Sequence, residues 1–156
     1  MDYLDTIKEF KQFFKTQELV SRDFYMKYGD EKCWAVFRPE LIANALVVRR
    51  DILKVGLVCN DWVFGGSHHQ RGFRENTCEL CVQKTKSGII YASPHPLGAA
   101  FDFKSAKMSA EEMRQRIIEN AYMLPYPMRL EKNVSWLHMD VCCLPTQKVK
   151  VYCFTA

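Results

Sequence analysis

The chain has 156 residues, of which 48% are apolar and 26% charged, and these values are typical of a single soluble globular domain with a substantial core. No apolar run approaches the roughly 20 residues that a membrane span needs. The net charge of +4, from 22 Lys and Arg against 18 Asp and Glu, is not the clustered basic charge of a nucleic-acid-binding protein, although it favours an anionic polymer such as a bacterial cell wall.

The first 56 residues carry the patterns of three helices. Residues 5–15 repeat apolar side chains at helical spacing, which predicts a short amphipathic helix. Ser21 is placed to cap a second helix, which we expect Gly29 to end. Pro39 suits the first position of a third, longer helix, which we expect Gly56 to end.

From residue 57 the sequence changes to short segments around a long loop. Residues 57–59 form an apolar run typical of a buried strand, and residues 60–74 form a polar loop without periodicity. A loop of this length in a compact domain is usually functional or mobile. Residues 77–86 then predict a short helix, and residues 89–91 a short extended piece.

The last third of the chain predicts one helix and four strands. The helix spans residues 109–123, where Ser109 and Glu112 have the spacing of a capping box. The predicted strands are residues 99–103, 128–131, 135–142 and 148–154. Helices that come first and strands that come mostly later predict an α+β fold, with an antiparallel sheet and flanking helices. We expect one domain, 1–156, with a helical part (1–56) and a part that carries the functional site (57–156).

The cysteines give two hypotheses about thiol chemistry. There are seven, so they cannot all pair within one chain, and the N-terminus lacks the basic stretch and apolar core of a secretory signal. We therefore expect synthesis in the cytoplasm and reduced, buried thiols. The alternative is a structural zinc site made from Cys78, Cys81, Cys142 and Cys143, which is disfavoured because adjacent cysteines rarely bind the same ion.

The stretch from Ser93 to Asp102 predicts a metal site. His95 and Asp102 are seven positions apart and are separated by a glycine and two alanines, and His138 follows in a strand-like run. Imidazole nitrogen and carboxylate oxygen suit zinc, which in catalytic sites takes three protein ligands and keeps one position for water. Strand alternation places Asp102 on the face opposite Phe101, and puts Asp140 on the same face as His138.

This stretch also resembles a known family. The residues that match the S-x-H-x-x-G-x-A-x-D motif of the zinc D-Ala-D-Ala carboxypeptidase family are Ser93, His95, Gly98, Ala100 and Asp102. The family includes vancomycin-resistance dipeptidases and phage endolysins, with the hedgehog signalling domain as a distant relative. The resemblance implies zinc ligation by His95, Asp102 and His138, a hedgehog-like fold, and hydrolysis of peptidoglycan stem peptides at D-Ala-D-Ala or L-Ala-D-Glu type linkages.

The sequence departs from the family around the last ligand. Ser135 stands where many relatives carry an acidic residue, and Trp136 where others carry a histidine. A carboxylate base is needed to take a proton from the zinc-bound water, and the sequence offers two candidates, Glu131 on the preceding strand and Asp140 beside His138. We favour Glu131 as base, with Asp140 orienting His138 or an arginine, but the choice stays open.

Other site residues come from the loop that precedes the motif. Relatives carry an arginine there, which implies that Arg71, with Arg74 as its rival, stabilises the oxyanion or clamps a substrate carboxylate. We expect substrate contacts from Gln70, Ser93 and Trp136.

Two settings follow from the resemblance. The first is outside the membrane, where a cell-wall substrate lies, and it suits a phage lysin released by lysis or an enzyme carried in a virion. The second is inside the cell, where the chain would act as an intracellular dipeptidase. The alternative class is a non-enzymatic zinc-binding structural or interaction module on the same fold, which the serine at position 135 favours.

Overall fold

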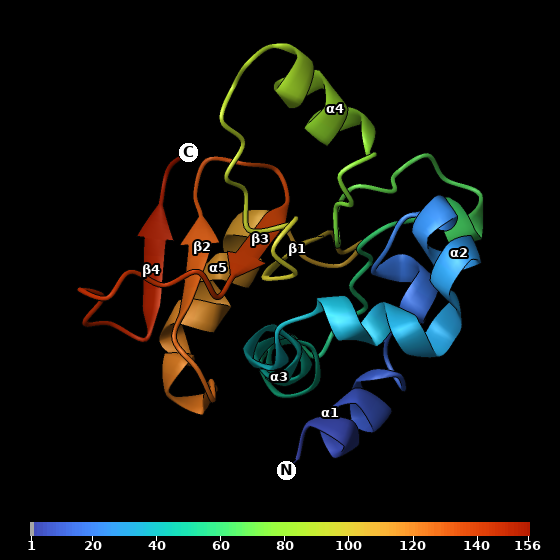
Figure 1. The fold of residues 1–156 in the computed structure, drawn as a ribbon. Coiled ribbons are helices and arrows are strands. Elements are labelled where there is room, and N and C mark those ends of the chain that lie inside the picture. Colours follow the sequence, from blue (N-terminus) through green and yellow to red (C-terminus); the bar gives the residue numbers. More distant parts are fainter. Residues whose placement is uncertain (1) are drawn as a thin grey trace.

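The computed structural model describes residues 2–156 and has the predicted α+β architecture, with helices packed around a four-stranded sheet (Figure 1). The helices are α1 (Tyr3–Phe10), α2 (Arg22–Lys32), α3 (Pro39–Val47), α4 (Glu79–Lys86) and α5 (Ala110–Glu119). The strands are β1 (Ala100–Phe103), β2 (Met128–Glu131), β3 (Leu137–Asp140) and β4 (Val151–Phe154). Within residues 2–156, none of the helices combines the length and the apolar character that crossing a bilayer requires.

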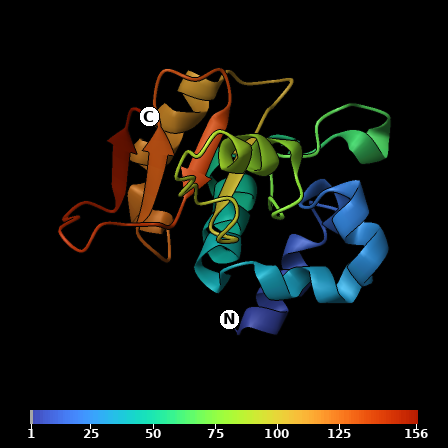
Figure 2. The same ribbon diagram turned by 45° about the horizontal axis from the view of Figure 1, so that its top comes forward.

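The sheet is mixed, whereas the sequence analysis predicts a wholly antiparallel one. Its strand order is β1-β3-β2-β4, and β3 pairs antiparallel with both β1 and β2. The fourth strand, β4, pairs parallel with β2 (Figure 2). After β3 the chain crosses to the far edge of β2. There β4 runs antiparallel to β3 and is therefore parallel to β2.

The starts of the second and third helices are set by the residues that the sequence singles out, whereas both of their predicted ends are wrong. Ser21 caps α2 by accepting a hydrogen bond from the Phe24 N–H at 3.1 Å, and Pro39 is the first residue of α3. The prediction that Gly29 ends the second helix is wrong, because Gly29, with φ of 73°, only kinks α2, which continues to Lys32. The prediction that Gly56 ends the third helix is wrong, because α3 continues as a wider turn, Val48–Leu53, and Lys54 ends it in the left-handed conformation.

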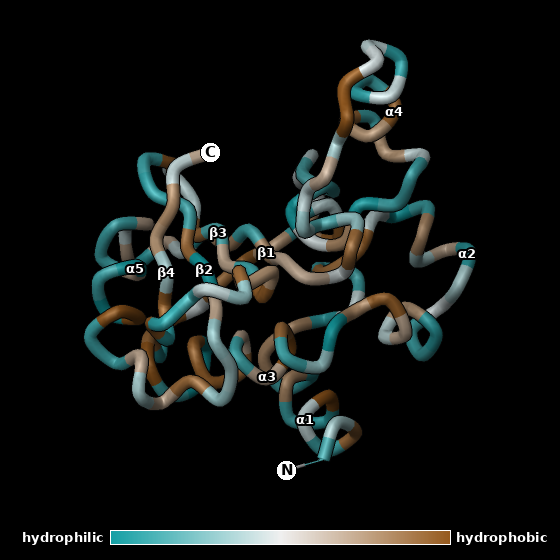
Figure 3. Tube along the Cα trace, turned by 60° about the vertical axis from the view of Figure 1, so that its left-hand side comes forward, coloured by the Kyte–Doolittle hydropathy of each residue, from teal (hydrophilic) through white to brown (hydrophobic). Residues whose placement is uncertain are grey.

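The segments between the helices and the strands contain less regular structure than expected. Residues 57–59 form no strand, and only Val58 pairs with the sheet, through an isolated bridge to Lys104. Residues 89–91 form no strand either, so that α4 and the loop after it project from the rest of the molecule (Figure 3). The capping box of Ser109 and Glu112 is confirmed at the start of α5, which ends at Glu119 and is followed by the short turn Ala121–Met123.

Aromatic side chains join the N-terminal helices to one face of the sheet. The rings of Phe10 and Phe14 stack on each other with centroids 4.7 Å apart. Phe10 faces Phe101 at 6.4 Å, and Phe14 faces Phe103 at 5.3 Å. The two parts of the chain therefore share one core. The opposite face of the sheet, which carries Asp102, is left for the polar site.

Gly98 holds the loop before β1 tightly against the N-terminal part. Its φ is +62°, its carbonyl accepts a hydrogen bond from the Arg38 N–H at 2.9 Å, and a Cβ at this position would lie 1.7 Å from the Val36 carbonyl oxygen. Both the positive φ and the close approach of the Val36 carbonyl therefore require glycine at this position.

We expect the substitution Gly98→Ala to destabilise the protein strongly. A non-glycine residue in the left-handed region costs about 1–2 kcal/mol, and the clash with the Val36 carbonyl adds to this cost because backbone must move. Gly88→Ala is the matched control, since Gly88 has φ of +66° and open space around it. Denaturant unfolding of both variants measures the difference. Equal destabilisation of the two would show that the contact with Val36 is unimportant.

Candidate metal centre

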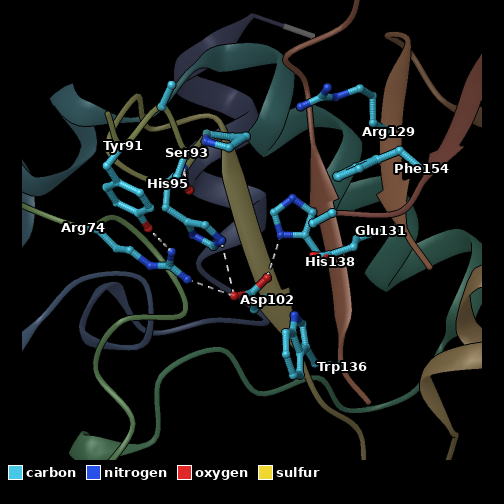
Figure 4. A pocket seen from close by; sticks show the side chains of 13 residues that line it. Arg74, Tyr91, Ser93, His95, Asp102, Arg129, Glu131, Trp136, His138 and Phe154 are labelled. Atoms are coloured by element: carbon cyan, nitrogen blue, oxygen red, sulfur yellow. Dashed lines mark hydrogen bonds and ion pairs between the residues drawn. The ribbon is translucent and has the colours of Figure 1, made fainter. Parts of the chain in front are cut away.

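The three predicted ligands lie together on the polar face of the sheet (Figure 4). Asp102 is on β1, His138 is its direct partner across the ladder on β3, and His95 comes from the loop before β1. All three are buried, and one ligand atom from each lies within 4.8 Å of the others. This buried group could hold a metal ion.

The spacing of the ligand atoms is close to that of a coordinated ion. The Asp102 carboxylate has Oδ1 2.8 Å from His138 Nδ1 and Oδ2 3.2 Å from His95 Nε2. A tetrahedral zinc site with ligand distances of about 2.0–2.1 Å has ligand-to-ligand edges of about 3.3–3.4 Å. The two distances from Asp102 to the histidines are therefore slightly shorter than the edges of such a site.

Hydrogen bonds on the outer nitrogens fix both imidazoles in the orientation that a metal requires. His95 Nδ1 lies 2.8 Å from the Gly72 carbonyl oxygen, which can only accept, so the proton is on Nδ1 and Nε2 faces the group. His138 Nε2 lies 3.1 Å from Asp140 Oδ2, which leaves Nδ1 toward Asp102. A histidine ligand whose other nitrogen donates to a carbonyl or carboxylate is the usual arrangement at metal centres.

In the metal-free group, a proton on His138 balances the charge of the Asp102 carboxylate. Burial would raise the pKa of Asp102, but the hydrogen bond from His138 holds it well below its usual range. Burial alone would lower the pKa of His138, yet Asp102 and Asp140 raise it to about 9. Burial lowers the pKa of His95 and keeps that imidazole neutral. A metal ion would therefore replace the proton of His138 beside a permanently charged carboxylate.

Asp140 hydrogen-bonds to His138, and both of its carboxylate oxygens already have hydrogen-bond partners. It is fully buried, and the Arg129 guanidinium donates two hydrogen bonds to it, of 2.8 and 3.2 Å. The Cys142 N–H donates to it at 2.9 Å, in addition to the contact with His138. Burial would raise the pKa of Asp140, but His138 and Arg129 lower it. This carboxylate therefore orients His138 and does not open onto a cavity.

We expect Asp140→Asn to weaken metal binding by about 10- to 100-fold, because an amide supports the His138 ring less well than a charged acceptor. Competition with a chromophoric chelator measures the affinity. Asp51→Asn is the matched control, since Asp51 is also held by an arginine, Arg50, through two hydrogen bonds but lies outside the site. An Asp140→Asn protein with the affinity of the control would remove this role from Asp140.

The group opens onto a cleft of about 430 Å³. Glu131 lines the cleft from β2 and lies beside His138, because the register that pairs Arg129 with Asp140 brings it next to that ligand (Figure 4). Among residues 2–156, its carboxylate makes no ion pair. Glu131 and Asp102 are the two carboxylate side chains that line the cleft, and Asp140 is not among the lining residues.

The structure brings Arg74, and not Arg71, to the group. The Arg74 guanidinium lies 3.3 Å from the Asp102 carboxylate and donates to the Tyr91 hydroxyl and the Gln70 carbonyl oxygen, both at 2.6 Å. Arg71 points elsewhere, with Nη1 3.4 Å from the Cys59 carbonyl oxygen, and lines a neighbouring cavity. The glycine and phenylalanine between the two arginines turn the chain so that only one side chain reaches the ligands.

The predicted substrate contacts are divided between the two cavities. Ser93 lines the cleft, Gln70 lines the neighbouring cavity, and Trp136 lines both. Gln70 also holds the start of α4, since its side-chain oxygen accepts from the Leu80 N–H at 3.1 Å. Ser135, at the family's acidic position, lines the neighbouring cavity and not the cleft.

The structure places several residues at the site that the sequence patterns did not indicate. Arg129 and Phe154 line the cleft, and the Arg129 guanidinium lies 4.8 Å from the centre of the Phe154 ring. Strand alternation with Glu131 is a signal that could have identified Arg129. The Gly72 carbonyl and the Tyr91 hydroxyl left no signal, because they reach the site only through the fold.

The cysteines lie apart from this group. Among residues 2–156, the only cluster of three or more potential metal ligands is the histidine and aspartate group, which contains no cysteine. Burial raises the pKa of Cys33 to about 11 and that of Cys81 to about 12, so both are protonated thiols at neutral pH. All seven cysteines are free thiols.

The arrangement has the parts that metal-assisted hydrolysis requires. Three potential metal ligands line a cleft, a carboxylate without an ion-pair partner among residues 2–156 lies beside one of them, and an oriented guanidinium lies beside another. No protein-family model, curated protein or solved structure matches this chain.

Proposed function

We propose that this protein is a zinc-dependent peptidase that hydrolyses peptidoglycan stem peptides, as a D-Ala-D-Ala carboxypeptidase or an L-Ala-D-Glu type endopeptidase. The observation that carries the proposal is the buried group of His95, Asp102 and His138 at the edge of a cleft. Two imidazole nitrogens and one carboxylate oxygen are a ligand set that suits zinc. The motif around His95 and Asp102, which resembles that of a peptidase family, supports the choice of substrate.

The base and the residues that position the ligands are side chains of the protein. When bound, the zinc ion supplies a water molecule of lowered pKa and polarises the scissile carbonyl. Glu131 would serve as the base that moves a proton from the attacking water to the leaving amine, because it lines the cleft and has no ion-pair partner among residues 2–156. Asp140 holds His138 in place, and Arg129 holds Asp140.

Arg74 stabilises the negative charge that develops on the substrate oxygen. A guanidinium has five N–H groups, and hydrogen bonds to Gln70, Tyr91 and Asp102 use three of them. These contacts fix the orientation of the fork and leave N–H groups for a substrate oxygen. A cation held in position before the reaction stabilises an oxyanion without the cost of reorganisation.

The proposal is tested by incubating the protein with a mixture of muropeptides, with zinc and after removal of zinc, and analysing the products by mass spectrometry. Cleavage that needs zinc supports it, and the masses identify the bond that is cut. Metal binding without cleavage of any muropeptide would support the second candidate, a non-enzymatic zinc-binding module. Ser135, which stands at the family's acidic position, favours that candidate. A peptidase of this kind would meet the cell wall as a phage lysin after lysis, or as an enzyme carried in a virion.

A further inference from the structure

Two cysteines outside the metal centre lie together at the start of α4. Cys78 is the N-cap of this helix, and Cys81 lies in its first turn. Both side chains are buried, and both are free thiols. The helix that they begin projects from the rest of the molecule (Figure 3). The pair therefore lies in a segment that adds little to the core, which leaves its thiol chemistry as the property to explain.

The start of the helix holds the two side chains close to each other. Cys78 Sγ accepts a hydrogen bond from the Cys81 N–H at 3.4 Å, so the Cys78 side chain is folded over the first turn toward Cys81. Residues three apart on an α-helix have Cα atoms about 5 Å apart, which is within the range of about 4.4–6.8 Å that a disulfide bridges. Closing a disulfide therefore requires side-chain rotation and little movement of the helix backbone.

The surroundings give the two sulfur atoms different roles. Cys78 lines a cavity of about 290 Å³, and Cys81 is not among the lining residues. A backbone N–H at a helix N-terminus stabilises a thiolate, which is the form that attacks a disulfide, and Cys78 Sγ has such a donor. Burial, and then a hydrogen bond to the Cys78 side chain, raise the pKa of Cys81 to about 12. Cys78 is thus the sulfur that a small reagent reaches, and Cys81 is its protonated partner.

The turn between the two cysteines is connected to the loop that carries Arg74. The Leu80 N–H donates to the Gln70 side-chain oxygen at 3.1 Å. The Gln70 carbonyl oxygen accepts a hydrogen bond from Arg74 Nε at 2.6 Å, and the Arg74 guanidinium contacts Asp102. A covalent bond across this turn would therefore strengthen the contact that holds Gln70 beside Arg74.

We propose that Cys78 and Cys81 are a redox-active pair, which closes to an intramolecular disulfide by exchange with a small-molecule disulfide and thereby fixes the turn that holds Gln70. The Cys78 thiolate attacks one sulfur of the reagent, whose S–S bond breaks and releases one thiol. The Cys81 sulfur then attacks the Cys78 sulfur, and its proton passes to the second thiolate that leaves. The two cysteines lose two electrons and two protons, and the reagent is reduced to two thiols.

The test equilibrates the wild-type protein, folded or unfolded in urea, with mercaptoethanol and its disulfide at varied ratios, followed by alkylation in denaturant and tryptic digestion. Residues 75–84 form one tryptic peptide that contains both cysteines, so the closed pair appears as this peptide without alkyl groups and lighter by two hydrogen atoms. We expect the equilibrium constant for closure to be about tenfold larger in the folded protein, because the helix start brings the side chains together beforehand. An equal or smaller constant in the folded protein would overturn the proposal.

Cys142 and Cys143 are the matched control pair in the same digest. Adjacent Cα atoms are about 3.8 Å apart, closer than the range of about 4.4 Å and above that is usual for disulfides, so this pair should gain nothing from folding. An equal gain by both pairs would remove any special role of the α4 pair. In the single variants, Cys81→Ser should accumulate a mixed disulfide on Cys78, whereas Cys78→Ser should leave Cys81 unmodified. The reverse pattern would overturn the assigned roles.

Hydrogen exchange tests the effect on the turn. The Leu80 amide should exchange about tenfold more slowly in the closed protein than in the reduced protein, because the bond opposes local opening of the first turn of α4. The Cys81→Ser variant, which cannot close, should show no difference between the same two buffers. Equal exchange of the Leu80 amide in closed and reduced wild-type protein would overturn the link from the cysteine pair to Gln70.

Discussion

Replacing Glu131 by glutamine is expected to abolish peptide cleavage while the protein keeps its full metal content. A general base contributes about 10²- to 10⁴-fold to a rate, and an amide cannot accept the proton. Metal binding should persist because Glu131 is outside the ligand group. The measurement pairs cleavage rates on muropeptides with metal analysis of the same sample. Glu119→Gln, which changes an exposed glutamate on α5, is the control and should cleave normally.

The outcomes separate the two candidate bases. Wild-type cleavage by Glu131→Gln would exclude the glutamate as the base. If Asp140 only positions His138, Asp140→Asn should recover most of its turnover when zinc is raised to saturation, because weak metal binding is then its only defect. A loss of turnover that saturating zinc does not repair would contradict a purely positioning role.

His138→Ala is expected to lower the metal content from about one equivalent to nearly none after dialysis. The change removes one of three ligands and leaves the charge of Asp102 with fewer partners. Elemental analysis of the dialysed protein measures the metal. The control is His68→Ala, since His68 lies in an exposed loop outside the ligand group.

Two results would contradict the assignment. Full metal content in a folded His138→Ala protein, with folding checked by circular dichroism, would show that the ion binds elsewhere. About two equivalents in the wild type would indicate a further site, for which Cys78 and Cys81 are the first residues to replace.

The sequence alone was enough to predict most of the helices and strands, and the three potential metal ligands that the structure brings together. The alternation of Asp102 with Phe101 and Phe103 assigned one face of β1 to the core and the other to the metal group, and the structure has this arrangement. Capping by Ser21 and by the Ser109 box was predicted for the same reason. These features depend on interactions between residues a few positions apart, which the order of residue types encodes directly.

Only the tertiary structure decided which residues complete the site. Arg74 contacts Asp102, which is 28 positions away in the sequence, and the Gly72 carbonyl accepts from His95, which is 23 positions away. Arg129 hydrogen-bonds to Asp140, which is 11 positions away. Glu131 is therefore the carboxylate with a free position in the cleft. The parallel pairing of β4 was decided in the same way, by the path of the chain around β2. The physical reason is that such contacts depend on how distant segments pack and on sheet register, and neither is contained in the spacing of residues along one segment.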